Sequence, residues 1–359
     1  MHREIGSEFH ITEKNNIILD RNLSIIQKSY HDYVYARSGR EAIGFILDEI
    51  EPCTRIAVLP AYICESMLEP FLKRGYSVEY FSIDQNFNPD LKEIEIALNK
   101  NPDVMLVIDW FGMNKNQEVI SLVKKRFPNL VTLADCTHNF FNDFMTIEAD
   151  FVIASLRKWF ALPDGAIAIN CRNDFKNRLK FVDSCFFNKR KKAMLLKAEY
   201  LNSREQSLKM QYRKLLSAAE HFLDSESMPV GISAFSLSLI NEMDFNFMKM
   251  KRRENFNALY DLIDGFASTP IINRTITSAE CPFCFPIIVE NNRNKLQEWL
   301  AGNGIYCPIL WPLPDYVYLN YEVSAYLSDN MLSIPCDQRY SVDDMEYIAK
   351  TIKAFFWRS

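Results

Sequence analysis

The feature that most constrains this chain is an alternation of short apolar runs with segments of helical periodicity between about residues 40 and 170. The apolar runs have the length of strands, and the segments between them repeat apolar residues every three or four positions. Repeated units of this kind predict a mostly parallel sheet covered by helices on both faces. The expected strands are RIAVLP (55–60), SVEYFSI (77–83), DVMLVIDWFG (103–112) and LVTLAD (130–135), and the expected helices are EAIGFILDEI (41–50), ICESMLEPFLKRG (63–75), NPDLKEIEIALNK (88–100) and NQEVISLVKKRF (116–127).

The pattern changes after this sheet. Residues 187–223 contain no Gly or Pro and many strong helix formers, which predicts one or two long helices. From about residue 235 the chain reads as a smaller α+β unit. We therefore expect a large α/β domain with the N-terminal region in 1–232 and a smaller domain in 233–359. The smaller domain is expected to hold helices near 233–243 and 248–263, strands near 284–290 and 304–310, and a terminal helix at 343–357.

Length and composition indicate an ordinary globular protein. A chain of 359 residues that is 48% hydrophobic can bury a large core. Its net charge of −5 gives no reason to expect nucleic acid or an anionic membrane as partner, which leaves small molecules or proteins. No apolar run spans a bilayer, and MHREIGSEFHITEKNN lacks the apolar middle of a secretory signal, so a cytoplasmic location is expected.

A cysteine pair and a basic cluster can each be interpreted either structurally or functionally. Cys281 and Cys284 form a CPFC pair, but no second pair lies nearby to complete a zinc site, and the segment also reads as a strand. The odd total of nine cysteines favours reduced thiols over a disulfide framework. The basic cluster at 189–192 either contacts a phosphate or acidic partner or forms a solvated helix face.

Three segments would meet at the carboxyl edge of the predicted sheet, where ligands collect in folds of this class. The first is SGREA (38–42), in which Ser38 and Gly39 directly precede a helix. A serine cap, exposed backbone N–H groups and the positive end of the helix dipole together form a phosphate site. The same residues also make an ordinary helix cap.

The second segment is LADCTH (133–138), where a strand ends at Asp135. A carboxylate at this edge would keep a cationic ring nitrogen protonated by a direct hydrogen bond. Alternatively, Asp135 only caps the next turn. His138 either orients an oxygen of the ring or stacks near it, or is simply a packed histidine.

The third segment is SLRK (155–158), within FVIASLRKWFALPDGAIAIN. The amine of Lys158 can form a Schiff base with an aldehyde, while the hydroxyl of Ser155 and the side chain of Arg157 can help to hold a phosphate. A lysine at a strand end also commonly projects into water. A phosphate site, an acidic partner for a ring nitrogen and an imine-forming lysine are together the requirements of pyridoxal 5'-phosphate (PLP).

In these segments the sequence resembles the fold-type I PLP enzymes, and most closely the nucleotide-sugar aminotransferases often called the DegT family. The resemblance covers about residues 36–170 and implies the PLP-transferase fold, with a mostly parallel seven-stranded sheet in the large domain. The matching elements are SGREAIGFIL, LPAYICESMLEPFLKRGYSVEYFSIDQNFNPD, DWFG, LADCTH and SLRKWFALPDGA; KRRENFNALYDLI, GIYCPILWPLP and LSIPCDQRYSVDDMEYIAKTI resemble the family's small domain and C terminus.

The resemblance also implies roles for residues and partners. Lys158 would be the Schiff-base lysine and Asp135 the partner of the pyridinium nitrogen. His138 would lie near the cofactor oxygen, and Tyr62 would stack on the cofactor ring. The phosphate would be bound in the Ser38 loop by the backbone of Gly39 and Arg40, and by the hydroxyl of Ser155. The family implies transamination from an amino donor, such as glutamate, to a carbonyl acceptor, such as a keto-sugar nucleotide, in a homodimer.

Several departures from the family pattern leave the substrate and the reaction open. Arg40 replaces a usual Thr, and Ser155 lies closer to the lysine than the family's phosphate serine. The same lysine and aspartate serve PLP lyases and dehydratases, and a PLP-binding protein without activity is a further alternative. The other departures are PDGA in place of a Gly-Glu-Gly-Gly return, Asp109 with Gly112 in place of His-x-x-Gly, and VGISAFS in place of an Asn-Tyr-Arg signature.

Overall fold

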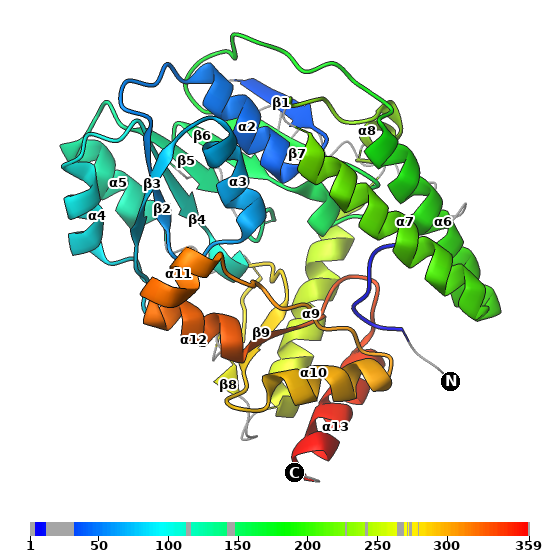
Figure 1. The fold of residues 1–359 in the computed structure, drawn as a ribbon. Helices are drawn as coiled ribbons and strands as arrows, with labels where there is room; N and C mark the ends of the chain where they lie inside the picture. The colour runs from blue at the N-terminus through cyan, green and yellow to red at the C-terminus, as the bar shows by residue number, and fades with distance from the viewer. Residues whose placement is uncertain are drawn as a thin grey trace.

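The computed structural model has a large part built on a seven-stranded sheet and a smaller part built on a three-stranded sheet (Figure 1). This is the predicted α/β class, with a mostly parallel large sheet and a small C-terminal sheet. The structure describes residues 4–11, 32–112, 116–141, 148–226, 228–240, 243–263, 269–270, 272, 275–278 and 280–357.

The large sheet has the strand order β1-β7-β6-β5-β4-β2-β3. The five strands from β3 to β6 run parallel, and β7 is antiparallel to both of its neighbours. Strands β2, β4, β5, β6 and β7 are almost entirely buried, which explains their continuous apolar runs. The strands are β1 (Asp32–Ala36), β2 (Ile56–Pro60), β3 (Ser77–Phe81), β4 (Val104–Ile108), β5 (Val131–Asp135), β6 (Phe151–Ala154) and β7 (Ala166–Asn170).

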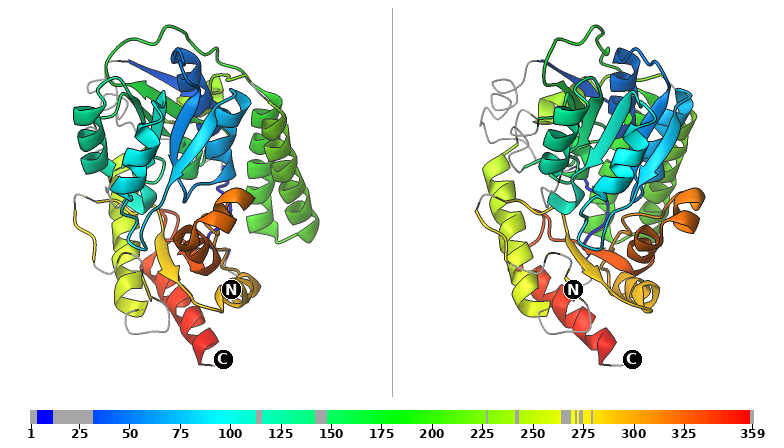
Figure 2. Two further views of the ribbon diagram at one scale, coloured as in Figure 1. Left: turned by 60° about the vertical axis from the view of Figure 1, so that its left-hand side comes forward. Right: turned by 90° about the vertical axis from the view of Figure 1, so that its left-hand side faces the viewer.

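Helices cover both faces of this sheet (Figures 1 and 2). Each lies between two strands of the alternation and packs its apolar side on the sheet. The predicted strand at 103–112 is shorter than expected, because the chain leaves the sheet after Ile108 and forms the short 3₁₀ turn η1 (Trp110–Gly112). The helices are α2 (Gly39–Glu49), α3 (Glu65–Lys73), α4 (Leu91–Leu98) and α5 (Asn116–Arg126).

Two long helices, α6 (Cys185–Ser203) and α7 (Gln206–Ser225), form a hairpin beside the large sheet. This confirms the helical prediction for 187–223. The hydroxyl of Ser184 caps the start of α6 by accepting a hydrogen bond from the Phe187 N–H at 3.2 Å. Arg204 ends the helix in the left-handed conformation, with φ of 63°.

Within the described residues, the smaller part packs the helices α9, α10 and α13 and a short antiparallel sheet around its own apolar cluster. Its sheet has the order β10-β9-β8, and helices α9 and α13 pack against each other beside it. The elements that follow the hairpin are α8 (Ala234–Ile240), α9 (Phe245–Ile263), β8 (Thr269–Pro270), β9 (Phe285–Ile288), α10 (Arg293–Gly302), α11 (Asp315–Asn320), α12 (Glu322–Asn330), β10 (Met331–Ile334) and α13 (Val342–Phe356).

The predicted strand at 304–310 is wrong. Among the described residues, Ile305 is the one position of this segment that forms a β-bridge, to Ile5, and Pro308 has no N–H to extend a ladder. The neighbours of β9 are instead β8 and β10, both of which are too short to stand out in the sequence. The strand predicted at 284–290 is confirmed at Phe285–Ile288.

Residues 4–11, here called the N-terminal strap, connect the smaller part to the hairpin (Figure 1). Ile5 bridges Ile305, and the backbone N–H of Gly6 donates to the hydroxyl of Tyr340 at 2.7 Å. On the other side, the carboxylate of Glu4 forms an ion pair with Lys209 of α7 at 3.2 Å. These contacts join the strap to residues that lie between 205 and 334 positions away from it in the sequence.

Among the described residues, no helix has both the length and the apolar character needed to cross a membrane.

Gly231 tests how tightly the hairpin is joined to the sheet. It bridges Ala36 and Phe181, and a Cβ at this position would lie 2.5 Å from the carbonyl oxygen of Lys180. Because backbone lies on that side, Gly231→Ala should lower the free energy of unfolding by about 2 kcal/mol or more. Urea unfolding followed by circular dichroism measures this change.

Gly302→Ala is the matched control, since a Cβ there meets no atom within 4 Å. It should leave stability unchanged or raise it by less than about 1 kcal/mol. Equal unfolding midpoints for the two variants would contradict the close approach at Gly231.

Candidate active site

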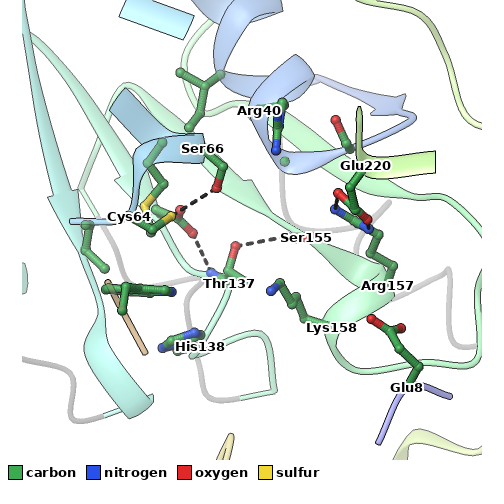
Figure 3. A pocket seen from close by; sticks show the side chains of 17 residues that line it. Glu8, Arg40, Cys64, Ser66, Thr137, His138, Ser155, Arg157, Lys158 and Glu220 are labelled. Atoms are coloured by element: carbon green, nitrogen blue, oxygen red, sulfur yellow. Dashed lines mark hydrogen bonds and ion pairs between the residues drawn. The ribbon is translucent and has the colours of Figure 1, made fainter. Parts of the chain in front are cut away.

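A cavity of about 290 Å³ opens at the carboxyl edge of the large sheet (Figure 3). Its walls come from the ends of β4 and β5, the turn after β6, the starts of α2 and α3, helix α7 and the N-terminal strap. Seven of the eight predicted site residues line it, namely Ser38, Gly39, Arg40, Asp135, His138, Ser155 and Lys158.

Lys158 lies on the 3₁₀ turn η3 (Leu156–Lys158), directly after β6. Backbone hydrogen bonds close this turn: the N–H of Leu156 donates to Gly165 at 3.0 Å. The amine projects into the cavity (Figure 3), and no described residue forms a hydrogen bond or ion pair with it. The Lys158 side chain is exposed toward the cavity, but the surrounding cavity walls partly desolvate its amine and lower its pKa, and the neighbouring Arg157 lowers it further. A larger fraction of this amine is therefore unprotonated than for a surface lysine.

Asp135 ends β5 and is only 3% exposed. Its Oδ1 accepts a hydrogen bond from the backbone N–H of Thr137 at 2.8 Å. Burial raises the pKa of this carboxyl to about 6, although Thr137 and Lys158 act in the opposite direction. A cation bound in the cavity against this side chain would favour its ionised form.

The start of α2 forms one end of the cavity. Gly39 and Arg40 are in the first helical turn, and their N–H groups donate to no other described residue. Ser155 lies directly opposite: a Cβ on Gly39 would be 3.4 Å from the Ser155 Cβ and 3.8 Å from its Oγ. Free N–H groups at a helix start, with a hydroxyl facing them, form a cradle for an anion.

Two side chains of the predicted phosphate loop are engaged elsewhere. The hydroxyl of Ser38 donates to the Glu41 carboxylate at 2.8 Å, so its single proton is already used. The guanidinium of Arg40 forms ion pairs with Glu69 and Asp224, at 2.9 and 2.5 Å. The loop therefore offers its backbone rather than these side chains to an anion.

His138 is both packed and part of the cavity wall. Its ring stacks on Phe283 at 4.1 Å between centroids, on Trp311 at 5.3 Å and on Phe111 at 5.4 Å. Its Nδ1 is buried and has no hydrogen-bond partner in the described part of the chain. Burial lowers the pKa of the ring to about 3, and Lys158 adds to this, so the imidazole is neutral at physiological pH.

Tyr62 is the predicted site residue that the structure places outside the cavity lining. Its ring is fully buried between Phe87 and Trp311, and its hydroxyl donates to the carbonyl of Leu310. The chain after β2 presents Cys64 to the cavity instead. Burial raises the pKa of this thiol, which lies 3.0 Å from the Ser66 hydroxyl.

Several lining residues were missed in the sequence. Thr137 lies within LADCTH, beside Asp135, and could have been found there. Glu8 and Glu220 come from the N-terminal strap and from α7, and nothing in the sequence pattern connects either of them to the cavity. Arg157 is not a free phosphate ligand, because its guanidinium pairs with Glu220 through contacts of 2.6 and 3.3 Å.

The departures from the family pattern are packed into the structure. Asp164, in the PDGA return, is fully buried and accepts hydrogen bonds from the Ser233 N–H at 2.9 Å and the Ser233 hydroxyl at 2.7 Å. Ser236 also donates to it. Through these hydrogen bonds, the segment VGISAFS (230–236) holds the PDGA return (163–166), which follows the lysine, in place. Asp109 similarly accepts a hydrogen bond from the side chain of Asn139.

The other two clusters have structural surroundings. Cys281 and Cys284 are buried, and no group of three or more His, Cys, Asp or Glu residues within the described ranges could hold a metal ion. In the basic cluster, the ammonium of Lys191 lies over the ring of Phe235 at 3.8 Å. Arg190 is only 2% exposed and forms ion pairs, so the solvated-face reading does not apply to it.

Comparison with known proteins finds likeness only at the level of structure. No protein-family model matches this sequence, and neither does any curated protein.

Solved structures match nearly the whole chain. One is a candidate sugar aminotransferase from Streptococcus pneumoniae in its PLP form, with 18% identity, a TM-score of 0.68 and coverage of 97% of this chain and 92% of that one. A second is PseC of Helicobacter pylori, an aminotransferase in the biosynthesis of pseudoaminic acid, with 14% identity, a TM-score of 0.67 and coverage of 99% and 100%. A third is a DegT DnrJ EryC1 StrS aminotransferase from Brucella abortus, with 16% identity, a TM-score of 0.62 and coverage of 93% and 88%.

At these identities the likeness concerns the fold, and it agrees with the strand order and with the cavity at the carboxyl edge of the sheet. The chain has the fold of the DegT/DnrJ/EryC1/StrS sugar aminotransferases, which is the fold-type I architecture of PLP enzymes.

Proposed function

We propose that the protein is a PLP-dependent aminotransferase in which Lys158 carries the cofactor. The observation that supports this most directly is that Lys158 and Asp135 line one cavity that has an anion cradle at its end. The orphaned, buried Nδ1 of His138 fits the same reading, because a group bound in the cavity can supply its missing partner.

Bound PLP would supply an aldehyde and an electron-withdrawing pyridinium ring. The N–H groups of Gly39 and Arg40 and the hydroxyl of Ser155 would bind its phosphate. Asp135 would hold the proton on the ring nitrogen. The amine of Lys158, with its lowered pKa, would act first as nucleophile and then as the group that removes and returns a proton at the substrate carbon.

The substrates are part of the proposal. The structural neighbours described as sugar aminotransferases favour an amino acid donor, with glutamate first, and a carbonyl acceptor such as a keto-sugar nucleotide. A homodimer is expected by the same analogy, with further site residues supplied by the second subunit.

Lys158→Ala tests the covalent role. The wild-type protein should retain PLP after borohydride reduction, with the added mass on the peptide that contains Lys158. The variant should bind PLP without retaining it, because the other cavity contacts remain. Lys192→Ala, on the exposed side of α6, is the control and should retain PLP as the wild type does. Retention by Lys158→Ala at wild-type level would exclude the proposed role.

Asp135→Asn tests the buried carboxylate. The substitution should stabilise the cofactor-free protein but impair the PLP-bound protein. In the cofactor-free protein, the raised pKa means that Asp135 favours folding at low pH and that this benefit is lost as pH rises from about 4 through about 6. The amide does not ionise, so the variant should gain stability relative to wild type across that range, by up to about 3 kcal/mol. Thermal unfolding at pH 4 and pH 7.5 measures the difference.

With PLP bound, the same substitution should be harmful. Loss of the charge opposite the ring nitrogen should lower turnover by about 100-fold or more. Asp261→Asn, on an exposed position of α9, should change neither quantity. Unchanged turnover in Asp135→Asn, or a stability gain that does not depend on pH, would contradict the assignment.

A panel of amino donors tests the reaction class. With the PLP-loaded protein, a transaminase should release about one equivalent of keto acid per subunit without ammonia, and the absorption spectrum should change in parallel. Release of ammonia or cleavage of a side-chain bond would instead indicate a lyase or dehydratase. No product with any donor would favour a PLP-binding protein without activity.

A further inference from the structure

We propose that Glu220 is a positioning residue for the cofactor-carrying lysine: from helix α7 it holds the Arg157 guanidinium beside Lys158 and balances its charge. This inference rests on the role proposed for Lys158. Its basis is an ion-pair arrangement in the cavity wall that connects the lysine turn to the α6–α7 hairpin (Figure 3).

The contact between Arg157 and Glu220 is forked. Nη1 of Arg157 lies 2.6 Å from Oε1 of Glu220, and Nη2 lies 3.3 Å from Oε2. A forked pair fixes the plane of the guanidinium as well as its position. The Arg157 side chain is 14% exposed and the Glu220 side chain 37%, so the arginine end of the contact is shielded from water while the carboxylate end is partly open to it. Arg157 is the residue directly before Lys158, and the pair therefore fixes the turn that carries the amine.

Glu220 is itself held from the other side. Arg190 of α6 donates to its Oε1 at 3.0 Å, and Arg190 also pairs with Glu8 of the N-terminal strap at 2.9 Å. The ring of Phe186 lies 5.3 Å from the Arg157 guanidinium and 5.7 Å from that of Arg190. The two cations and two carboxylates form an alternating chain, so the hairpin places a neutral, preorganised wall next to the lysine.

The charges that face Lys158 come from several elements. Arg157 lies on its own turn, Glu220 on α7 and Glu8 on the strap, and the thiol of Cys64 lies before α3. Asp135 on β5 and the neutral ring of His138 also face the amine. Arg40 on α2 lines the same cavity, but its charge is paired with Glu69 and Asp224.

Glu220 is ionised at neutral pH. Burial opposes this, but Arg157 and Arg190 lower the pKa of its carboxyl to about 2. Desolvation by the cavity walls and Arg157 lower the pKa of Lys158, while Cys64, Glu8 and Glu220 act in the opposite direction. Removing the charge of Glu220 therefore has two effects of the same sign: a carboxylate that favours the ammonium is lost, and Arg157 is left uncompensated beside it.

The test measures the lysine directly in the full-length, cofactor-free protein. The pH dependence of acetic anhydride labelling, with the Lys158 peptide quantified by mass spectrometry, gives the pKa of the amine. Glu220→Gln should lower this pKa by about one unit and raise labelling at pH 7 by about tenfold. Arg157→Met should shift it upward instead, and the double variant should return it toward the wild-type value.

Two variants separate charge from structure. Glu220→Asp keeps the charge and should stay close to wild type. Glu199→Gln makes the same chemical change at an exposed position of α6 and should not shift the lysine. If Glu220→Gln alone does not fold, the difference in Lys158 pKa between Arg157→Met and the double variant still measures the effect of the Glu220 charge.

An unchanged Lys158 pKa in a folded Glu220→Gln protein would overturn the proposal. A Lys158 pKa in the double variant equal to that in Arg157→Met would overturn it as well. These outcomes are distinct from failure of the proposed function. The labelling experiment requires no cofactor, and failure of Lys158 to retain PLP would leave the titration result standing.

Discussion

The candidate site depends on one glycine, Gly165, which ties three parts of the chain together through its backbone. Its N–H donates to the carbonyl of Arg37 at 2.7 Å, and its own carbonyl accepts from Leu156 at 3.0 Å. Its backbone φ of 139° is rarely adopted by residues other than glycine, and a Cβ at this position would lie 3.0 Å from the Ile232 side chain. Arg37 lies just before the start of α2, where the anion cradle lies, and Leu156 begins the turn η3, which carries Lys158. These two hydrogen bonds therefore set the distance between the anion cradle and the lysine.

The second organising principle is the pairing of buried charge. Removing an ion from water costs several kcal/mol, and partners placed in advance offset that cost. Arg37 lies against Glu41, Arg157 against Glu220, and Arg40 against Glu69. Within the described ranges, Lys158 is the cavity cation without such a partner. A lysine left in this state beside satisfied neighbours is the arrangement expected of a reacting group rather than of a structural one.

Much of this architecture could be predicted from the sequence, since it depends on local patterns. The buried parallel strands produce continuous apolar runs, and strand ends locate Asp135 and Lys158 on one edge. Contacts that depend on distant parts of the chain could not be predicted in this way. The long helices at 187–223 were recognisable, but nothing in their periodicity shows that Glu220 faces the lysine. Tyr62 was assigned by resemblance, and the turn of the chain after β2 directs its ring into the core.

The N-terminal strap has a consequence for how the protein is made. Ile5 pairs with Ile305, Gly6 with Tyr340, and Glu8 with Arg190. During translation this segment leaves the ribosome long before its partners exist, so its contacts with the smaller part cannot form until Ile305 and Tyr340 have been synthesised. The nascent sheet can form earlier from its own neighbours in sequence. The strap therefore reaches its full set of contacts only after the smaller part has been made.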